Sequence, residues 1–141
     1  VIEMPVFGIT VFAEQGKGAF LNGKKVRVSN KKTLEHSCII FEFSNEKRKE
    51  KLMFLERIAD IIFDLRDFGC AVYNLVLIAS SKAHAVVMRT SQPWDIAAGI
   101  LLVKESGGMI TDFEGNKYTF ARQDCLASNG KIHNELLTYV K

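Results

Sequence analysis

The chain has 141 residues, of which 48% are hydrophobic and 25% are charged, and its formal net charge at pH 7 is +3. This length suits one domain with a hydrophobic core, and the composition is that of a globular rather than a disordered protein. Because the charge is small and no stripe of lysine and arginine alternates with aromatic residues, nucleic acid is not expected as a partner.

The sequence also bears on membranes and on the cellular compartment. No apolar run approaches the roughly 20 residues of a membrane span, and the first residues lack the pattern of a signal peptide. Cys38, Cys70 and Cys125 lie far apart, so we expect buried free thiols of a reducing compartment, the cytoplasm, rather than a zinc site or a disulfide framework. Residue 1 is Val, and the opening residues read as a strand already under way; we therefore expect the chain to begin inside a longer protein.

The N-terminal part of the chain predicts strands and one hairpin. Residues 6–13 are β-branched and aromatic, which predicts a strand. Asn22-Gly23 between two short runs predicts a hairpin with a type I′ turn, because that turn needs positive φ at both central residues. The alternation of valine with basic residues over 24–29 predicts a further strand with one buried face.

One stretch of this region imitates a phosphate-binding loop. Residues 18–24 fit the pattern Gly-x-x-x-x-Gly-Lys. Such a loop needs Ser or Thr next, to hold magnesium, followed by a helix whose amides face the phosphate. Here Lys25 occupies the hydroxyl position and a strand is expected to follow. We therefore interpret the stretch as part of the hairpin.

The middle of the chain predicts a buried strand over 38–43 and then a helix. The helix is expected to begin at Asn45 as its N-cap, with Glu46 in its first turn. Apolar residues spaced by three or four predict its inner face, namely Leu52, Leu55, Ile58, Ala59 and Ile62.

The chain then alternates between helices and strands. Gly69 is expected to break the chain before a largely apolar helix over 70–80, and a strand is expected over 83–88. Ser91 and Pro93 mark the start of the next helix.

That next helix has a clear inner face and a clear end. Ile96, Ile100 and Val103 are expected to face the core, and Gly107-Gly108 to end the helix, which is the usual place of glycine past a helix C-terminus. Short strands are expected within 108–116 and 124–130, and a closing helix over 131–140. The alternation predicts a single layered α/β domain rather than a bundle or a barrel.

Asp95, in the first turn of this helix, permits two interpretations. Acidic residues are common there because the free amides and the helix dipole stabilise them, and taken alone this structural role is the commoner one. However, Ala97, Ala98 and Gly99 allow another element or a ligand to approach closely, and Trp94 is expected to anchor the turn rigidly. A carboxylate fixed and kept ionised in this way is a hard oxygen ligand of the type that Mg²⁺ prefers.

Several motifs together resemble those of the inositol monophosphatase family. Residues 93–99, Pro-Trp-Asp-Ile-Ala-Ala-Gly, continued by Glu-Ser-Gly-Gly-Met-Ile-Thr-Asp at 105–112, resemble the family's C-terminal signature. Residues 66–71, Arg-Asp-Phe-Gly-Cys-Ala, resemble its Arg-x-x-Gly-Ser/Thr-Ala. The stretch 16–29 resembles its hairpin, and 126–137 its last strand and helix. The resemblance covers nearly the whole chain.

The resemblance implies a fold and an activity. The fold would be a layered α/β sandwich, with a mixed sheet flanked by helices and an N-terminal β-hairpin, as in the C-terminal part of the family's αβαβα fold. Family members are magnesium-dependent, lithium-sensitive sugar-phosphate phosphatases, including fructose-1,6-bisphosphatases. The expected reaction is hydrolysis of a phosphate monoester of a sugar or polyol, in which magnesium ions polarise the phosphoryl oxygens, activate water and stabilise the leaving alkoxide.

The resemblance also assigns roles to individual residues. Asp95 matches the aspartate that ligates a catalytic magnesium ion. Gly69, Cys70 and Ala71 match the loop whose backbone and side chains border the substrate. Apart from the resemblance, the charge of Arg89, which directly follows Met88, makes it a candidate for binding a second anionic group, although a surface arginine is the commoner outcome.

The chain departs from the family pattern in its metal ligands. The family's glutamate pair and its Asp-Pro-Ile-Asp-Gly-Thr motif are not found here. The chain therefore looks like the C-terminal half of such an enzyme, with residues 1–29 as strands of the preceding sheet and 37–141 as the C-terminal α/β domain. One aspartate with waters is expected to hold Mg²⁺ only weakly.

Two further departures concern the substrate. Met88 stands seven residues before Asp95, where inositol-specific members carry a glutamate that binds sugar hydroxyls. Because methionine cannot accept those hydrogen bonds, the resemblance supports myo-inositol phosphate as the substrate less strongly. Cys70 replaces the usual hydroxyl residue, and a small packed thiol is preferred over a nucleophile because no histidine base is identifiable nearby.

Three functional hypotheses remain open at this stage. The leading one is a phosphatase present as its C-terminal half, with a small-molecule sugar or inositol phosphate as its partner. The second is a non-catalytic relative that binds a sugar phosphate or a protein, and the third is an enzyme rebuilt from two chains. A homodimer is also expected, because strands of an incomplete sheet would leave an exposed edge.

Overall fold

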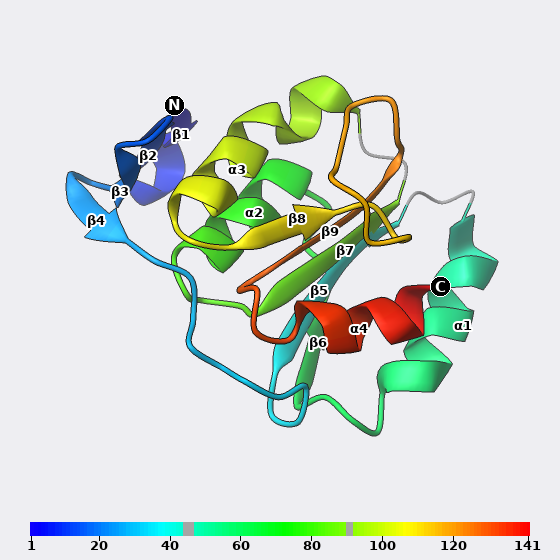
Figure 1. Cartoon of the computed structure of the whole chain (residues 1–141). Helices are drawn as coiled ribbons and strands as arrows, with labels where there is room; N and C mark the ends of the chain where they lie inside the picture. The colour runs from blue at the N-terminus through cyan, green and yellow to red at the C-terminus, as the bar shows by residue number, and fades with distance from the viewer. Residues whose placement is uncertain (44–46, 90–91) are drawn as a thin grey trace.

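Two sheets organise the structure, a computed structural model that describes residues 1–43, 47–89 and 92–141 (Figure 1). The first sheet is antiparallel, with the strand order β1-β2-β3-β4. Its strands are β1 (Ile2–Met4), β2 (Ile9–Glu14), β3 (Gly18–Leu21) and β4 (Lys24–Val26). It corresponds to the N-terminal strands and hairpin that the sequence predicts.

The second sheet is mixed, as the resemblance implies. Its strands lie in the order β6-β5-β7-β9-β8, with β5 parallel to β6 and β7, and β9 antiparallel to β7 and β8. The strands are β5 (Cys38–Phe43), β6 (Asp64–Arg66), β7 (Ala85–Arg89), β8 (Met109–Thr111) and β9 (Asp124–Ser128). The parallel strands place their carboxyl ends at one edge of the sheet, which is where α/β folds build sites.

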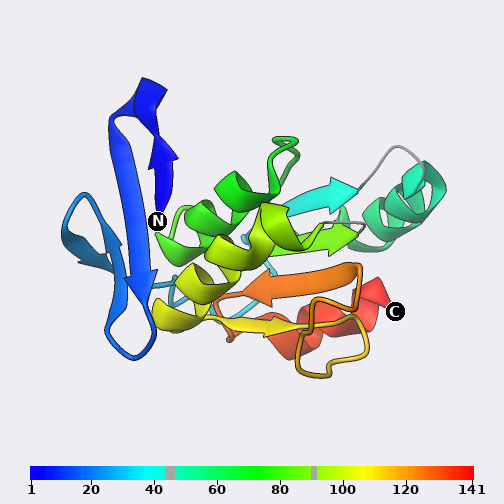
Figure 2. The same cartoon turned by 90° about the horizontal axis from the view of Figure 1, so that it is seen from above.

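Helices cover both faces of the mixed sheet. The helices α1 (Arg48–Ile58) and α4 (His133–Val140) pack on one face, and α2 (Ala71–Ala79) and α3 (Pro93–Glu105) on the other. The N-terminal sheet lies outside α2 and α3, so the layers run sheet, helices, sheet, helices (Figures 1 and 2). The expected layered α/β sandwich is confirmed. None of the described helices combines the length and the apolar character that crossing a membrane requires.

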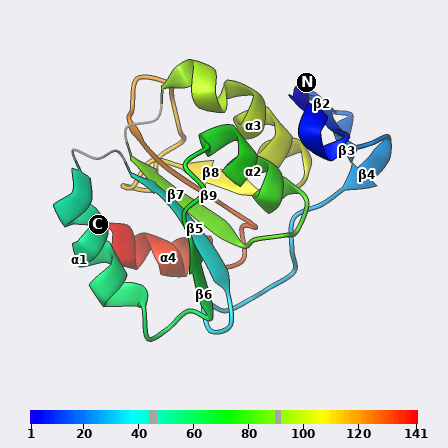
Figure 3. The same ribbon diagram turned by 180° about the vertical axis from the view of Figure 1, so that it is seen from behind.

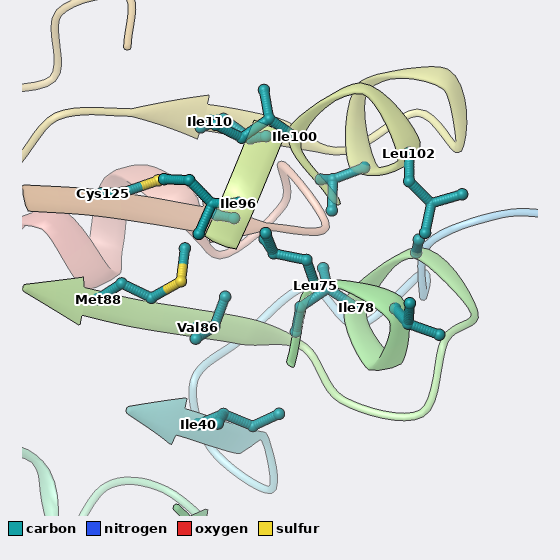
Figure 4. Close-up of a cluster of buried hydrophobic side chains, with 14 of the residues drawn as sticks. Ile40, Leu75, Ile78, Val86, Met88, Ile96, Ile100, Leu102, Ile110 and Cys125 are labelled. Carbon is teal, nitrogen blue, oxygen red and sulfur yellow. The ribbon is translucent and has the colours of Figure 1, made fainter. Parts of the chain in front are cut away.

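The alternation of side chains along β5 explains why both faces are covered. Ile39 and Phe41 belong to the cluster under α1 and α4, whereas Ile40 belongs to the cluster under α2 and α3. Figure 4 shows the second cluster, where Ile40 and Val86 of the sheet face side chains of both helices. A central strand buried on both faces has a nearly continuous apolar run, as 38–43 does.

The hairpin prediction is confirmed, whereas the extent of the neighbouring strands differs. Asn22 and Gly23 have φ of 46° and 76°, as a type I′ turn requires. The first predicted strand begins at Ile9 rather than at residue 6, because a turn of 3-10 helix at Pro5–Phe7 and Gly8 at φ 60° precede it. The strand predicted over 24–29 ends at Val26. Beyond it, the backbone amide of Val28 donates a hydrogen bond to the carbonyl of Ser106.

The inner face of α1 is only partly as predicted. Phe54 and Ile58 are buried, whereas Leu52 is 64% exposed. Phe54 replaces it because its ring packs 5.8 Å from that of Phe41, measured between ring centroids. Ala59 lies at the C-cap and Ile62 beyond the helix, and the predicted Asn45 cap and Glu46 lie outside the described residues.

The predicted inner face of α3 is confirmed, and the helix also makes a very close contact with α2. Ile96, Ile100 and Val103 are buried, and Gly107 follows the helix with φ of 90°. A Cβ atom on Gly99 would lie 2.5 Å from Cδ1 and 2.7 Å from Cβ of Leu75 in α2. The absence of a side chain at Gly99 therefore sets the distance between α2 and α3. The predicted start at Ser91 lies outside the described residues.

A polar link joins the N-terminal sheet to the rest of the molecule. The Glu105 carboxylate at the end of α3 accepts hydrogen bonds of 2.9 Å from the backbone amides of Gly16 and Gly18. These bonds hold the pKa of Glu105 below its usual value. Val11 and Ala19 of the same sheet are buried in the cluster that also contains Ile96, so the two sheets share one core.

We expect Gly99→Ala to lower the free energy of unfolding by about 1–3 kcal/mol, because it overpacks the contact with Leu75. An ordinary glycine-to-alanine change inside a helix stabilises it by up to about 1 kcal/mol, so the sign is diagnostic. Urea denaturation measures it, and in a Leu75→Ala background the loss is expected to shrink. A Gly99→Ala variant as stable as the parent would contradict the close approach.

Candidate functional site

A cleft lies at the carboxyl-end edge of the parallel strands. Its volume is about 600 Å³. The beginnings of α2 and α3, with the loop before α2, provide most of its walls, and Figure 3 shows these two helices side by side over the sheet. The lining residues are Val1, Ile2, Glu42, Gly69, Cys70, Ala71, Val72, Arg89, Trp94, Asp95 and Ala98. The cleft thus contains all five residues that the sequence nominated.

The first wall is the N-terminus of α2. Gly69 has φ of 65°, a conformation that suits glycine, and Cys70 is the extended N-cap before Ala71 begins the helix. The first amides of a helix have no acceptor within it and form the positive end of its dipole. The loop is tethered, because Asp67 accepts a bond from the Gly69 amide at 3.3 Å and pairs with Lys51 of α1. This wall can therefore receive an anion.

The second wall carries Asp95 in the first turn of α3. Asp95 is exposed, and its amide donates to the Gln92 carbonyl at 3.0 Å. Within the described residues its carboxylate forms no hydrogen bond or ion pair. Pro93 at the start of the helix fixes the entry of the chain. The expectation that Trp94 anchors this turn is wrong, since its side chain is 79% exposed; Pro93 and the packing of α3 hold Asp95 instead.

The cleft also holds Glu42, which the sequence reasoning missed. Glu42 is the one charged residue of the otherwise apolar strand β5, and it lies half-buried. Its Oε2 accepts a 2.8 Å hydrogen bond from Nδ2 of the fully buried Asn74 in α2. Burial, followed by repulsion from Asp67, raises the pKa of Glu42, and Asp95 adds to the rise. A lone acid in a buried strand was the signal that could have found it.

Arg89 reaches the cleft from the end of β7 but is already engaged. Its guanidinium pairs with Glu50 of α1 and lies 4.7 Å from the centroid of the Phe113 ring. The hydrogen bond from Lys47 lowers the pKa of Glu50, and Arg89 lowers it further. Arg89 also borders a hollow of about 210 Å³ beside α1 and α4. Its predicted role in binding a second anionic group therefore stays a prediction.

The oxygen donors of the cleft fit a magnesium ion in part. Asp95 offers a carboxylate without a partner among the described residues, and Glu42 lies in the same cleft. Hard oxygen ligands of this kind suit Mg²⁺. However, the described part of the chain contains no group of three or more His, Cys, Asp or Glu residues that could hold a metal ion. A complete cage needs further ligands from outside these residues.

Comparison with known proteins decides the family. The sequence model of the inositol monophosphatase family matches residues 1–141. The chain belongs to the inositol monophosphatase family. Family members and close relatives named as phosphatases make phosphoester hydrolysis the activity of this family in general.

Individual relatives show how much of the family's length the chain represents. It is 36% identical over 140 residues to a fructose-1,6-bisphosphatase/inositol-1-monophosphatase of Thermotoga maritima, covering 99% of this chain and 54% of that protein. It is 31% identical over 146 residues to the Nus factor SuhB of Pseudomonas aeruginosa, covering 100% of this chain and 54% of that protein. The chain thus spans about half the length of these relatives.

Solved structures give the same picture. The extragenic suppressor protein suhB of Bartonella henselae superposes with a TM-score of 0.93 at 32% sequence identity. The match covers 97% of this chain and 54% of that one. The fold of this chain is therefore that of an inositol monophosphatase-like protein over nearly all of its length.

The structure shows where the two residues that depart from the family's substrate-binding pattern lie. Met88 is fully buried and points into the core beside Val86 and Ile96 (Figure 4), so it does not line the cleft. Cys70 is exposed at the N-cap of α2 and Cys38 is only partly buried, so the expectation of three buried thiols is wrong for both. An N-cap side chain lies outside the packed face of its helix. Cys125 is buried as expected, and its burial raises the pKa of the thiol.

A serine–histidine pair away from the cleft has a structural role. Nδ1 of His133 lies 2.8 Å from Oγ of Ser128, and Nε2 lies 2.9 Å from Oγ1 of Thr111. The Thr111 hydroxyl donates to the Asp112 carbonyl, so Nε2–H must donate to Thr111 and Nδ1 accepts from Ser128. All three side chains are buried. The neutral imidazole therefore joins β8, β9 and α4 rather than activating a nucleophile.

The burial of His133 predicts a pH-dependent stability. Burial lowers its pKa from 6.5 to about 4, so the unfolded chain binds this proton more tightly than the folded one. The contribution of the neutral, buried His133 to the free energy of unfolding is complete above pH 6.5 and is lost as pH falls toward 4. At about 1.4 kcal/mol per pKa unit it is on the order of 3 kcal/mol. Urea denaturation between pH 7 and pH 4 measures it.

The test variant is His133→Gln. The matched control is His36→Gln, because the side chain of His36 is largely exposed. We expect His133→Gln to flatten the slope of stability against pH, since its side chain does not titrate, and His36→Gln to leave the slope unchanged. Equal slopes for wild type and His133→Gln would contradict this role.

Proposed function

We propose that the chain takes part in the magnesium-dependent hydrolysis of a phosphate monoester of a sugar or polyol. The observation that supports it best is the presence, in one cleft, of the Asp95 carboxylate and of the N-terminus of α2. The first suits a divalent cation and the second suits an anion. A phosphate ester bound with magnesium needs both.

In this proposal the residues divide the work by charge. Gly69, Cys70 and Ala71 border the substrate phosphate. The amides of Cys70 and Ala71 receive it at the positive end of α2, whereas the Gly69 amide donates to Asp67 and holds the loop in place. Asp95 is a magnesium ligand. Arg89 approaches a second anionic group on substrates that carry one, and its pair with Glu50 orients it. Cys70 contributes its amide rather than acting as a nucleophile.

Magnesium, when bound, would polarise the phosphoryl oxygens and acidify the attacking water. Asp95 would hold it from this chain, with further ligands supplied by a preceding half. We propose that residues 1–141 are the C-terminal half of the enzyme, with 1–29 belonging to the preceding sheet and 37–141 to the C-terminal domain. Lithium inhibition is expected from the family. The unpaired cysteines agree with the cytoplasm as the location.

We expect Asp95→Asn to lower kcat/KM at least about 100-fold in the natural polypeptide that contains residues 1–141, because the neutral amide is a weak magnesium ligand. The assay screens sugar and polyol phosphates for phosphate release with magnesium, with and without lithium. Asp60→Asn is the matched control, since Asp60 is exposed just after α1 and does not line the cleft. Undiminished turnover by the Asp95→Asn variant would exclude the proposed ligand role.

We further expect residues 1–141 purified alone to have negligible phosphatase activity, because one aspartate holds Mg²⁺ only weakly. Phosphate release is measured for this fragment and for the natural polypeptide at equal concentration. Magnesium-dependent turnover by the fragment that disappears on Asp95→Asn would refute this expectation.

A second candidate function is a non-catalytic module that binds a sugar phosphate or a protein. It is favoured by the incomplete ligand set of the described residues and by a relative whose name is a Nus factor rather than a phosphatase. An Asp-Pro-x-Asp-Gly-Thr segment encoded upstream supports the enzyme, and a start codon near Val1 supports the module. Adding the missing half in trans tests an enzyme rebuilt from two chains.

Pairing with a second copy is part of either proposal. Val6 and Phe7, next to the edge strand β1, are 93% and 67% exposed. Exposed apolar residues beside a free strand edge favour association. Either a preceding segment or a second copy would cover them.

A further inference from the structure

We infer that Glu42 is a specificity-determining residue, which accepts a hydrogen bond from a hydroxyl group of the substrate's sugar or polyol. The inference rests on the proposed function, and it names the part of the cleft that recognises the alcohol rather than the phosphate. Four observations carry it: the position of Glu42 in β5, its bond to Asn74, its charge, and the chemistry of its neighbours.

The backbone of β5 directs Glu42 into the cleft. Side chains alternate along a strand, so Ile40 and Glu42 point to the same face of the sheet. Ile40 is buried under α2 and α3, and Glu42, two residues closer to the carboxyl end, reaches the cleft. Its register partner on β7 is Met88, which is buried in the core. Between these two neighbouring positions, Glu42 alone presents a polar group to the cleft.

Asn74 holds the Glu42 carboxylate in place, although one of its own buried polar atoms lacks a partner among the described residues. Its Nδ2 donates to Oε2 of Glu42 at 2.8 Å, while its buried Oδ1 finds no partner among the described residues. Turning the amide over would set Oδ1 against the carboxylate. A buried acceptor without a partner lowers the stability of the folded state. The fold thus accepts an unsatisfied oxygen in order to fix Glu42 in one orientation.

The charge of Glu42 is compensated only in part. Within the described residues it forms no ion pair; Lys51 favours its ionised form, whereas burial, Asp67 and Asp95 disfavour it, and the net effect raises its pKa. A half-buried carboxylate in this setting gains most from hydrogen-bond donors that enter the cleft. Perturbed acids in clefts are enriched at functional sites for this reason.

The chemistry of the cleft decides which donors these are. With Oε2 held by Asn74, Oε1 of Glu42 is left to bind a ligand. A carboxylate accepts hydrogen bonds and repels phosphate, so it recognises hydroxyl groups. The N-terminus of α2 attracts the phosphate instead. Together they orient a polyol phosphate with its phosphate toward Cys70 and Ala71 and a hydroxyl toward Glu42.

The test compares Glu42→Gln with wild type in the natural polypeptide that contains residues 1–141. Glutamine keeps the volume and an oxygen for Asn74, but replaces the remaining acceptor by a donor. Glu56→Gln is the matched control, since Glu56 is exposed on α1 and does not line the cleft. Substrates are myo-inositol 1-phosphate and fructose 1,6-bisphosphate, which are rich in hydroxyls, and phenyl phosphate, which has none.

We expect Glu42→Gln to lower kcat/KM for at least one hydroxyl-rich ester by about 10- to 100-fold, and to change that for phenyl phosphate less than twofold. An equal loss for all three esters, or no loss for any, overturns the inference. If wild type hydrolyses none of them, the proposed function fails, and calorimetric binding of the same esters with magnesium decides the role of Glu42. A loss of affinity confined to the hydroxyl-rich esters supports it, and any other binding result overturns it.

Discussion

The close packing of α2 against α3 is the constraint on which the candidate site depends. Gly99 lets Leu75 approach to a distance that no side chain at this position would allow. Because the two helices begin at the same edge of the sheet, this contact also fixes the distance between their first turns. Asp95 stands on one of these turns and the Gly69–Ala71 loop on the other. The separation of a proposed metal ligand from a proposed phosphate site is therefore set by a glycine one turn further along the helix.

Polar links on the periphery keep this pair of helices in place. Glu105 bonds the amides of Gly16 and Gly18, which ties the outer sheet to the end of α3. Lys51 pairs with Asp67 and so joins α1 to the loop before α2. Such exposed pairs contribute little stability each. Their value here is geometric, because each one restrains a segment that borders the cleft or supports a helix that does.

The cleft itself combines groups that a stable core would avoid. Glu42 is half-buried without an ion pair among the described residues, and Asn74 keeps an unsatisfied oxygen beneath it. Both features lower stability and both lie in the cleft or directly under it. In contrast, the buried polar network around His133 is satisfied at both ring nitrogens and supports the opposite face of the sheet. The difference between the two networks separates a binding role from a structural one.

The sequence by itself determined the local elements and the family. The Asn22-Gly23 turn, the buried strand at 38–43 and the inner face of α3 depend on residues adjacent in the chain, so short patterns predict them. The Trp-Asp motif likewise pointed to the family and to Asp95. Tertiary structure alone decided that Trp94 and Cys70 are exposed, that Met88 is buried, and that Phe54 rather than Leu52 packs under α1. It also brought Glu42 into the cleft with Asp95, 53 positions later in the chain. These outcomes depend on the register of parallel strands and on how closely helices approach, and contacts between distant segments fix both.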